Sequence, residues 1–222
     1  MPPGDLLERG DPELPALVFL HAAGTGPEIW LPQLEHFAEH FHVLAPDLND
    51  DAVDAAFSVP TAAAAVAELI DTKAGGTAIV VGISLGAFVA LQLAVDDPEK
   101  VQALVLSGGQ SRPARAGLFL TYVLLALVPK RFTIRPGGSK RALLRSYRSL
   151  FSWDLHDQLK DVKARTLVLC GTKDRPNLAA ARELAAKIPG AELKLIEDAG
   201  HLWVGGRARE FNEILTAFAD SR

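Results

Sequence analysis

A serine lies between two glycines in the stretch V-V-G-I-S-L-G-A, residues 80–87. The residues before Ser84 are apolar and β-branched, as in a buried strand, and Leu85 to Val95 has the composition of a helix. A G-x-S-x-G sequence on such a strand–turn–helix is typical of a nucleophilic serine. The sharp turn exposes the hydroxyl at the helix N-terminus, where the helix dipole favours developing negative charge. Ser84 is therefore the candidate nucleophile.

A serine of ordinary pKa needs a base, and the base needs an acid to orient it. His201 stands in D-A-G-H-L-W, just after the last expected strand, and is the expected general base. Asp174 follows the expected strand T-L-V-L-C and is the expected acid, accepting a hydrogen bond from the far imidazole nitrogen. Asp198 is a rival acid, although it lies only three residues before His201.

A metal is not expected from the remaining histidines. His36 and His40 are four residues apart, but Phe37 stands where a zinc protease motif requires glutamate. We expect this pair on a solvated helix face, and we expect no metal and no organic cofactor.

The loop H-A-A-G-T-G follows the first strong strand and is the candidate oxyanion loop. The backbone N–H groups of Ala23 and Leu85 are the expected donors to a tetrahedral oxyanion. His21, Ala22 and Trp203 are expected to contact the substrate.

Short apolar runs alternate with helical segments, which predicts an α/β fold: a mostly parallel sheet with helices on both faces. Such sheets bind ligands beyond the carboxyl ends of their strands, where the candidate residues lie. The expected strands are Ala16–Leu20, His42–Ala45, Thr77–Val81, Ala103–Leu106, Thr166–Cys170 and, at an edge, Glu192–Ile196. The expected helices are Ile29–His40, Thr61–Lys73 with its threonine as cap, Leu85–Val95, Asn177–Lys187 and Arg207–Asp220.

One region interrupts this alternation. Residues 111–160 contain no strand pattern and carry ten basic and two acidic side chains, a net charge of +8, against −12 for the rest. We interpret them as a small helical cap inserted into a core of residues 1–110 and 161–222. Within the cap, Gly117 to Val128 is apolar nearly all round, so it must be buried, cover the pocket or touch lipid.

Three roles for the basic cap stay open. It can hold an anionic group of the substrate at the rim of an apolar acyl pocket, as for a thioester on a phosphorylated carrier. It can make a weak contact with an anionic membrane surface. It can also be a solvated face that only balances an acidic core.

Composition sets the remaining limits. With 222 residues, of which 49% are hydrophobic, the chain is expected to form one globular domain. The net charge of −4 gives no reason to expect nucleic acid as a partner. Cys170 is the one cysteine, so no intrachain disulfide forms. The first ten residues lack an apolar signal-peptide core, and no apolar run reaches membrane-spanning length, so a cytoplasmic location is expected.

Taken together, these motifs resemble the α/β-hydrolase superfamily over nearly the whole chain, and the small single-domain esterases, C–C hydrolases and cofactor-free perhydrolases most. The order Ser84, Asp174, His201 matches that of the superfamily. H-A-A-G-T-G-P-E-I-W resembles its H-G-x-G…W stretch, and L-V-L-C-G-T-K-D and D-A-G-H resemble its acid and histidine loops.

The chain departs from the family pattern at four places. Ala22 stands where the family usually has glycine. Gly205-Gly206-Arg207 occupies the stretch after the histidine where the family usually has an acid-and-proline pattern. Asn49-Asp50-Asp51 replaces a glycine-rich turn. The first two strands of the family are expected to be largely missing, because only about 15 residues precede A-L-V-F-L.

The resemblance implies a hydrolase, here a carboxylesterase, that cleaves a small-molecule ester or thioester through a Ser-His-Asp triad and an acyl-enzyme. The same residues would also serve a cofactor-free C–C hydrolase, lyase or perhydrolase. A binding protein of this fold without turnover is the alternative from a different class.

Overall fold

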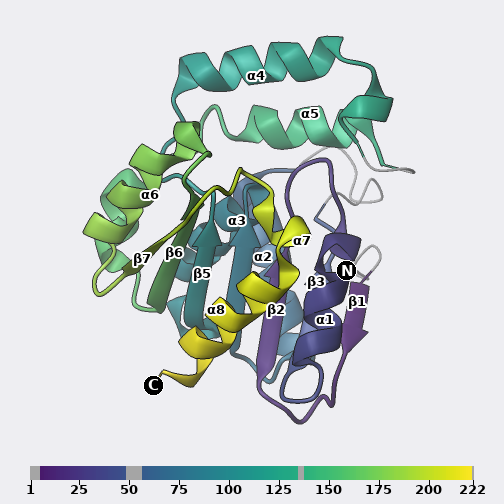
Figure 1. The fold of residues 1–222 in the computed structure, drawn as a ribbon, viewed down its shortest axis with the longest axis vertical. Helices are drawn as coiled ribbons and strands as arrows, with labels where there is room; N and C mark the ends of the chain where they lie inside the picture. Colours follow the sequence, from purple (N-terminus) through teal and green to yellow (C-terminus); the bar gives the residue numbers. More distant parts are fainter. Residues whose placement is uncertain (1–5, 49–56, 135–137, 222) are drawn as a thin grey trace.

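The computed structural model describes residues 6–48, 57–134 and 138–221. In these ranges the chain forms a seven-stranded sheet of order β1-β3-β2-β4-β5-β6-β7 (Figure 1). Neighbouring strands are parallel except β1, which runs antiparallel to β3. The strands are β1 Leu6–Arg9, β2 Ala16–Leu20, β3 His42–Pro46, β4 Ala78–Ile83, β5 Val101–Ser107, β6 Arg165–Gly171 and β7 Glu192–Ile196.

Both edges of this sheet bear on the sequence predictions. β7 pairs only with β6 and confirms the expected edge strand. At the other edge, the sequence predicts no strand before Ala16, and this is wrong for β1, whose Arg9 lies opposite Val43. The sequence of β1, L-L-E-R, ends in two charged residues and is only partly buried, so it lacks the apolar run that marks the buried strands.

Helices cover both faces of the sheet, as predicted (Figure 1). Alternate residues of each strand face opposite sides: Val18 packs in the core formed with α2 and α3, and Phe19 packs in the core formed with α1 and α8. The helices of the core are α1 Leu31–Phe37, α2 Val59–Lys73, α3 Leu85–Asp96, α6 Arg175–Lys187, the short α7 Trp203–Gly206 and α8 Ala208–Asp220.

Two helices begin differently from the prediction. The expected helix Ile29–His40 is a 3-10 turn, Pro27–Trp30, followed by α1, which ends at Phe37. α2 is capped by Ser58 rather than by Thr61, and Thr61 completes the reciprocal capping box three residues later. The stretch Asn49-Asp50-Asp51 lies outside the described residues.

The described part of the predicted insertion contains two α-helices, α4 (Arg115–Leu127) and α5 (Lys140–Ser149), which lie above the sheet at the top of Figure 1. The Lys140 Nζ donates to the carbonyls of Ala126 and Val128, both at 2.7 Å. These hydrogen bonds connect the start of α5 to the end of α4. Of α4 only Leu118 is buried, so the first of the three expectations for this apolar segment, burial, is wrong. No described helix has the length and hydropathy needed to cross a bilayer.

Candidate active site

Ser84 occupies the turn between β4 and α3 with φ 52° and ψ −115°. This is a region of backbone space that glycine enters readily and other residues rarely do. The turn is fixed from both sides: the Ser84 N–H donates to the Ser107 carbonyl at 2.9 Å, and its own carbonyl accepts from the Ala87 N–H at 2.9 Å. The strained turn leaves the Ser84 side chain half-exposed at the start of α3.

The two glycines of G-x-S-x-G allow this turn to pack. A Cβ on Gly82 would lie 2.2 Å from the Gly86 carbonyl oxygen, and a Cβ on Gly86 would lie 2.1 Å from the Leu20 carbonyl oxygen. Both contacts are with backbone and are too short for any side chain. The motif therefore lets α3 begin directly against the ends of β2 and β4.

Asp174 and His201 meet at the ends of two neighbouring strands. The His201 Nδ1 lies 2.8 Å from Asp174 Oδ2, and the loops that carry them are joined by a hydrogen bond from the Lys173 N–H to the Ala199 carbonyl at 2.9 Å. The rival acid, Asp198, is exposed and pairs with Lys173 at 3.1 Å. The structure thus brings Asp174, and not Asp198, to the imidazole.

The end of β5 connects this pair to the serine. Ser107 accepts the Ser84 N–H, and the next residue, Gly108, lies so close to His201 that an added Cβ would be 2.8 Å from the ring Cε1. Within the described part of the chain, no hydrogen bond joins the Ser84 hydroxyl to His201. Catalytic hydrogen bonds of this kind often form only when substrate is bound.

Asn177 completes the site and was missed by the sequence reasoning. Its Nδ2 donates to both Asp174 oxygens, at 2.9 and 3.0 Å, while its Oδ1 accepts from Gln110 Nε2 at 2.8 Å. The same Nδ2 is 3.2 Å from His201 Nδ1. The available pattern was a polar residue three positions after the expected acid, in the first turn of the following helix.

These contacts set the ionisation of the acid. Burial alone would raise the pKa of Asp174, but hydrogen bonds from His201 and Asn177 outweigh it and hold that pKa below its ordinary value. Cys170, just before the loop, behaves in the opposite way: burial, with the nearby Asp174 charge, raises its pKa to about 11. Cys170 therefore stays a neutral thiol and offers no competing nucleophile.

We predict that Asn177→Ala destabilises the protein in a pH-dependent way. The lowered pKa of Asp174 adds stability that is fully present above its unfolded value, near 4, and is lost as pH falls through the lower folded value. Without the Asn177 amide the folded pKa rises, so the cost should be about 1–2 kcal/mol at pH 7 and shrink toward pH 3. Urea unfolding of both proteins across this range measures it.

Asn212→Ala is the matched control. Asn212 is equally buried, but its Oδ1 accepts from Gln33 Nε2 at 2.9 Å and no carboxylate takes part. Its cost should stay constant across the same pH range. A cost for Asn177→Ala that is also constant would show that Asn177 does not act on the ionisation of Asp174.

The candidate oxyanion donors lie on two adjoining segments. The Gly86 N–H donates to the His21 carbonyl at 3.1 Å, which holds the loop after β2 against the start of α3. Leu85 is the first residue of α3, so its N–H has no partner within the helix. On the cap side, the Thr133 carbonyl would lie 2.7 Å from a Cβ on Gly24, so the cap closes over the loop that carries Ala23.

The three residues expected to contact substrate lie in the interior. His21 is fully buried; its Nδ1 lies 2.8 Å from the Ala22 carbonyl oxygen, and its Nε2 lies 2.9 Å from the Leu48 nitrogen and 3.1 Å from Asp47 Oδ1. Ala22 is buried beside it, and Trp203 donates from Nε1 to Ser107 Oγ at 3.2 Å. All three support the walls of the site, and a substrate contact for them stays a prediction.

His36 and His40 do not form a metal site. His36 and His40 are exposed, and α1 ends between them at Phe37. In the described ranges, no three His, Cys, Asp or Glu side chains are close enough together to hold a metal ion.

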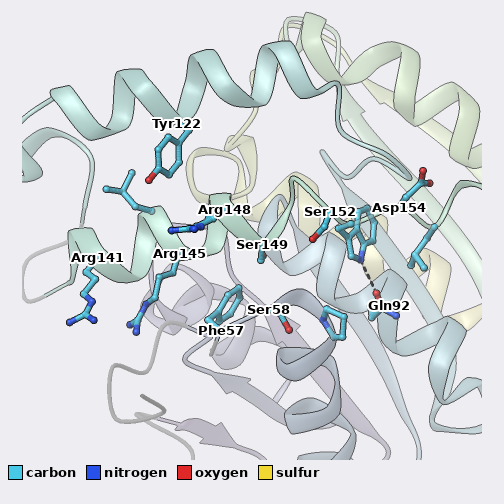
Figure 2. A pocket seen from close by; sticks show the side chains of 14 residues that line it. Phe57, Ser58, Gln92, Tyr122, Arg141, Arg145, Arg148, Ser149, Ser152 and Asp154 are labelled. Carbon is cyan, nitrogen blue, oxygen red and sulfur yellow. Dashed lines mark hydrogen bonds between the residues drawn. The ribbon is translucent and has the colours of Figure 1, made fainter. Parts of the chain in front are cut away.

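A separate crevice of about 1060 Å³ lies between the cap and the core (Figure 2). Its cap side carries Arg141, Arg145 and Arg148, which share one face of α5, and its core side includes Phe57 and Ser58 at the start of α2. Neither the serine, the histidine nor the aspartate of the candidate triad lines it. We call it the arginine crevice; its charge suits an anionic group.

Its floor is fixed to the core. Trp153 donates from Nε1 to Gln92 Oε1 at 2.7 Å, the bond drawn in Figure 2, and its ring meets Phe88 edge-on with centroids 4.8 Å apart. Because both partners are on α3, the end of the cap is anchored to the helix that begins at Ser84.

Comparison with known proteins identifies the family. The sequence model of the alpha/beta hydrolase family matches residues 17–214, so the chain belongs to this family. The fold is also that of "a hydrolase from Pseudomonas aeruginosa PA01", with a TM-score of 0.86, 22% identity, and coverage of 97% of this chain and 94% of that one.

Relatives with named activities are similar over almost their full lengths. "Putative carbamate hydrolase RutD" of Serratia proteamaculans is 28% identical, over 95% of this chain and 93% of its own. "Poly(3-hydroxyalkanoate) depolymerase" of Ectopseudomonas oleovorans is 27% identical, over 94% and 86%. The structure of Est816, described as an N-acyl homoserine lactone degrading enzyme, has a TM-score of 0.83 and 27% identity, with 96% of each chain covered.

Proposed function

We propose that this α/β hydrolase is a serine hydrolase that cleaves a carboxylic ester or thioester through Ser84, His201 and Asp174. The observation that carries the proposal is the strained Ser84 turn, fixed through Ser107 beside the Asp174–His201 pair at 2.8 Å. A strained non-glycine residue on a strand–turn–helix, next to an oriented imidazole, supports nucleophilic catalysis better than a structural role.

In the first half-reaction, Ser84 Oγ attacks the substrate carbonyl carbon while His201 Nε2 removes the hydroxyl proton. Asp174, ionised because its pKa is lowered, stabilises the resulting imidazolium through Nδ1. The N–H groups of Ala23 and Leu85 bind the oxyanion of the tetrahedral intermediate. His201 then protonates the leaving alcohol or thiol as its bond to the carbonyl carbon breaks, leaving an acyl-Ser84 ester.

In the second half-reaction, His201 removes a proton from water, which attacks the acyl carbon. The tetrahedral intermediate collapses, the proton passes from His201 to Ser84 Oγ, and the carboxylic acid leaves. No step requires a group other than these side chains, the backbone donors and water.

The relatives support acyl transfer as the type of reaction. Their names concern a carbamate, a hydroxyalkanoate polyester and an acyl homoserine lactone, and each of these presents a carbonyl carbon bearing a heteroatom leaving group. The test is hydrolysis of p-nitrophenyl esters from acetyl to palmitoyl by the wild type and by Ser84→Ala. Absence of turnover in the wild type, or turnover that survives in the variant, would overturn the proposal.

The arginine crevice favours a thioester on a phosphorylated carrier as a second candidate substrate. Arg141 and Arg148 line it, and neither has an acidic side chain within 4 Å among the described residues. Because the triad lies outside the crevice, a single small anion there would not reach the reacting carbonyl. A long carrier arm would join the two, with its phosphates on the arginines and its acyl group at Ser84.

We therefore predict that the double variant Arg141→Gln, Arg148→Gln raises KM for acyl-coenzyme A thioesters by about tenfold or more, with kcat unchanged. KM for the same acyl group on N-acetylcysteamine, which has no phosphate, should not change. Arg209→Gln, an exposed arginine on α8, is the control for lost charge. Equal effects on both thioesters would count against a phosphate site.

A further inference from the structure

The outer face of α4 exposes an unusual amount of apolar surface. Of the eight large apolar side chains that are exposed in the described ranges, five lie within 14 residues, with exposed fractions of 53–76%. They are Phe119, Leu120, Leu124, Leu127 and Phe132. Contiguous apolar surface of this kind on a water-soluble domain marks an interaction site.

Helix geometry places four of these residues on one side. Leu120, Leu124 and Leu127 are spaced four and three residues apart, and Phe119 adjoins them, so they form one stripe. The opposite side makes the contact with the rest of the cap, where Leu118 is buried and the Tyr122 ring lies 6.1 Å from that of Phe151. Figure 1 shows α4 as the outermost element of the cap, with α5 between it and the core.

Basic side chains flank this stripe at both ends of α4. Residues 111–153 contain nine lysines and arginines and no aspartate or glutamate. Arg115 begins α4, and Lys130 and Arg131 follow its end; all three are exposed, with no acidic side chain within 4 Å in the part of the chain described. The Arg131 guanidinium lies 4.6 Å from the centre of the Phe132 ring, so charge and apolar surface are adjacent.

We propose that α4 is a membrane-docking helix, whose apolar stripe enters the interface of an anionic bilayer while the flanking basic side chains bind lipid headgroups. An exposed apolar face flanked by lysine and arginine is the pattern of helices that lie in the membrane plane. With 13 residues, α4 is about 20 Å long, shorter than the roughly 30 Å hydrocarbon core, so it lies on the bilayer and does not cross it.

Charge argues against a second copy of this chain as the occupant. Pairing two α4 stripes face to face would bring two basic caps together, and residues 111–153 offer no acidic group to neutralise them. An anionic bilayer supplies both an apolar interior and a dense layer of negative charge. Since residues outside the cap carry −12, the same surface would repel the core and orient the protein cap-first.

The test is cosedimentation of the full chain with vesicles of equal parts phosphatidylglycerol and phosphatidylcholine, and with pure phosphatidylcholine. We expect binding to the mixed vesicles, weaker by at least about tenfold on pure phosphatidylcholine and weakened by 0.5 M NaCl. Leu120→Gln with Leu124→Gln should reduce binding about tenfold or more. Lys130→Gln should reduce it about fivefold.

Matched controls lie outside the cap. Leu193→Gln changes an exposed leucine on the edge strand β7, and Lys163→Gln removes an exposed lysine before β6; neither should alter binding. An unchanged thermal midpoint shows that a variant is folded. The proposal would be overturned by any of three results: no binding to vesicles, equal binding to both lipid compositions, or unchanged binding by the leucine variants. Dimerisation that the leucine variants abolish would assign the stripe to a second copy and also overturn it. None of these readouts depends on catalysis.

Discussion

Ser84→Ala is expected to lower kcat/KM for p-nitrophenyl esters by at least about 10⁴-fold while leaving the fold intact. Alanine and serine bear a similar steric cost at φ 52°, so the exchange removes the nucleophile without changing the strain of the turn. The Ser84 N–H and carbonyl keep their hydrogen bonds to Ser107 and Ala87. Initial rates, together with thermal unfolding of the same preparation, measure both effects.

Ser84→Gly separates the strain from the chemistry. Glycine adopts this φ and ψ without steric cost, so this variant should be as inactive as Ser84→Ala but more stable than the wild type by roughly 1 kcal/mol. Thr72→Ala is the control, because the Thr72 hydroxyl donates within its own helix, to the Glu68 carbonyl at 2.8 Å and the Leu69 carbonyl at 3.4 Å. It should keep wild-type turnover. A Ser84→Ala protein that retains more than a few per cent of the activity would place the nucleophile elsewhere.

The candidate triad could be predicted from sequence because each member lies in the segment that follows a strand of the parallel sheet. The strands β4 and β6 are largely apolar and buried, whereas β7 alternates between polar and apolar residues and is mostly exposed. In the structure, Ser84 follows β4, Asp174 follows the end of β6 by three residues, and His201 follows β7. Parallel pairing then brings these ends to one edge of the sheet.

The contact of Asn177 with Asp174 could not be predicted from a position directly after a strand. Asn177 lies in the first turn of α6, so its amide meets Asp174, the residue that precedes the helix, and a second contact comes from Gln110, 67 residues earlier. The spacing of three residues is visible in the sequence, but the contact with Gln110 leaves no local pattern. The strand β1 was missed because only its first two residues, both leucines, are apolar and pack against the core, and the strand ends in the charged residues Glu8 and Arg9.

The exposure of α4 shows what hydropathy leaves undetermined. The composition of Gly117 to Val128 predicts that something apolar covers the helix, and leaves open whether that is the core, the substrate or lipid. In the structure α5 covers the side that carries Leu118, and the side that carries Leu124 is left in solvent. The sequence therefore predicts that the apolar helix contacts another apolar surface. Only the packing shows which side of the helix has no such contact within the described chain.

Gly86→Ala is expected to be the most damaging single-methyl change in the core. The new Cβ would lie 2.1 Å from the oxygen and 2.5 Å from the carbon of the Leu20 carbonyl, so β2 and α3 would have to move apart. We expect a loss of about 3 kcal/mol or more, a fall of roughly 6–12 °C in Tm. Residual folded protein should also lose turnover, because the Gly86 N–H bond to the His21 carbonyl holds the oxyanion loop in place.

Two other glycines turn this into a graded comparison measured by thermal unfolding. Gly117 lies within α4, and nothing within 4 Å meets an added Cβ, so Gly117→Ala should stabilise by up to about 1 kcal/mol through helix propensity. Gly75 has equal space but φ +64°, so Gly75→Ala should cost about 1 kcal/mol through backbone strain alone. From highest to lowest Tm, the expected order is Gly117→Ala, Gly75→Ala, Gly86→Ala. If the Tm of Gly86→Ala were equal to that of Gly75→Ala, the close approach of β2 and α3 could not be the reason that position 86 requires glycine.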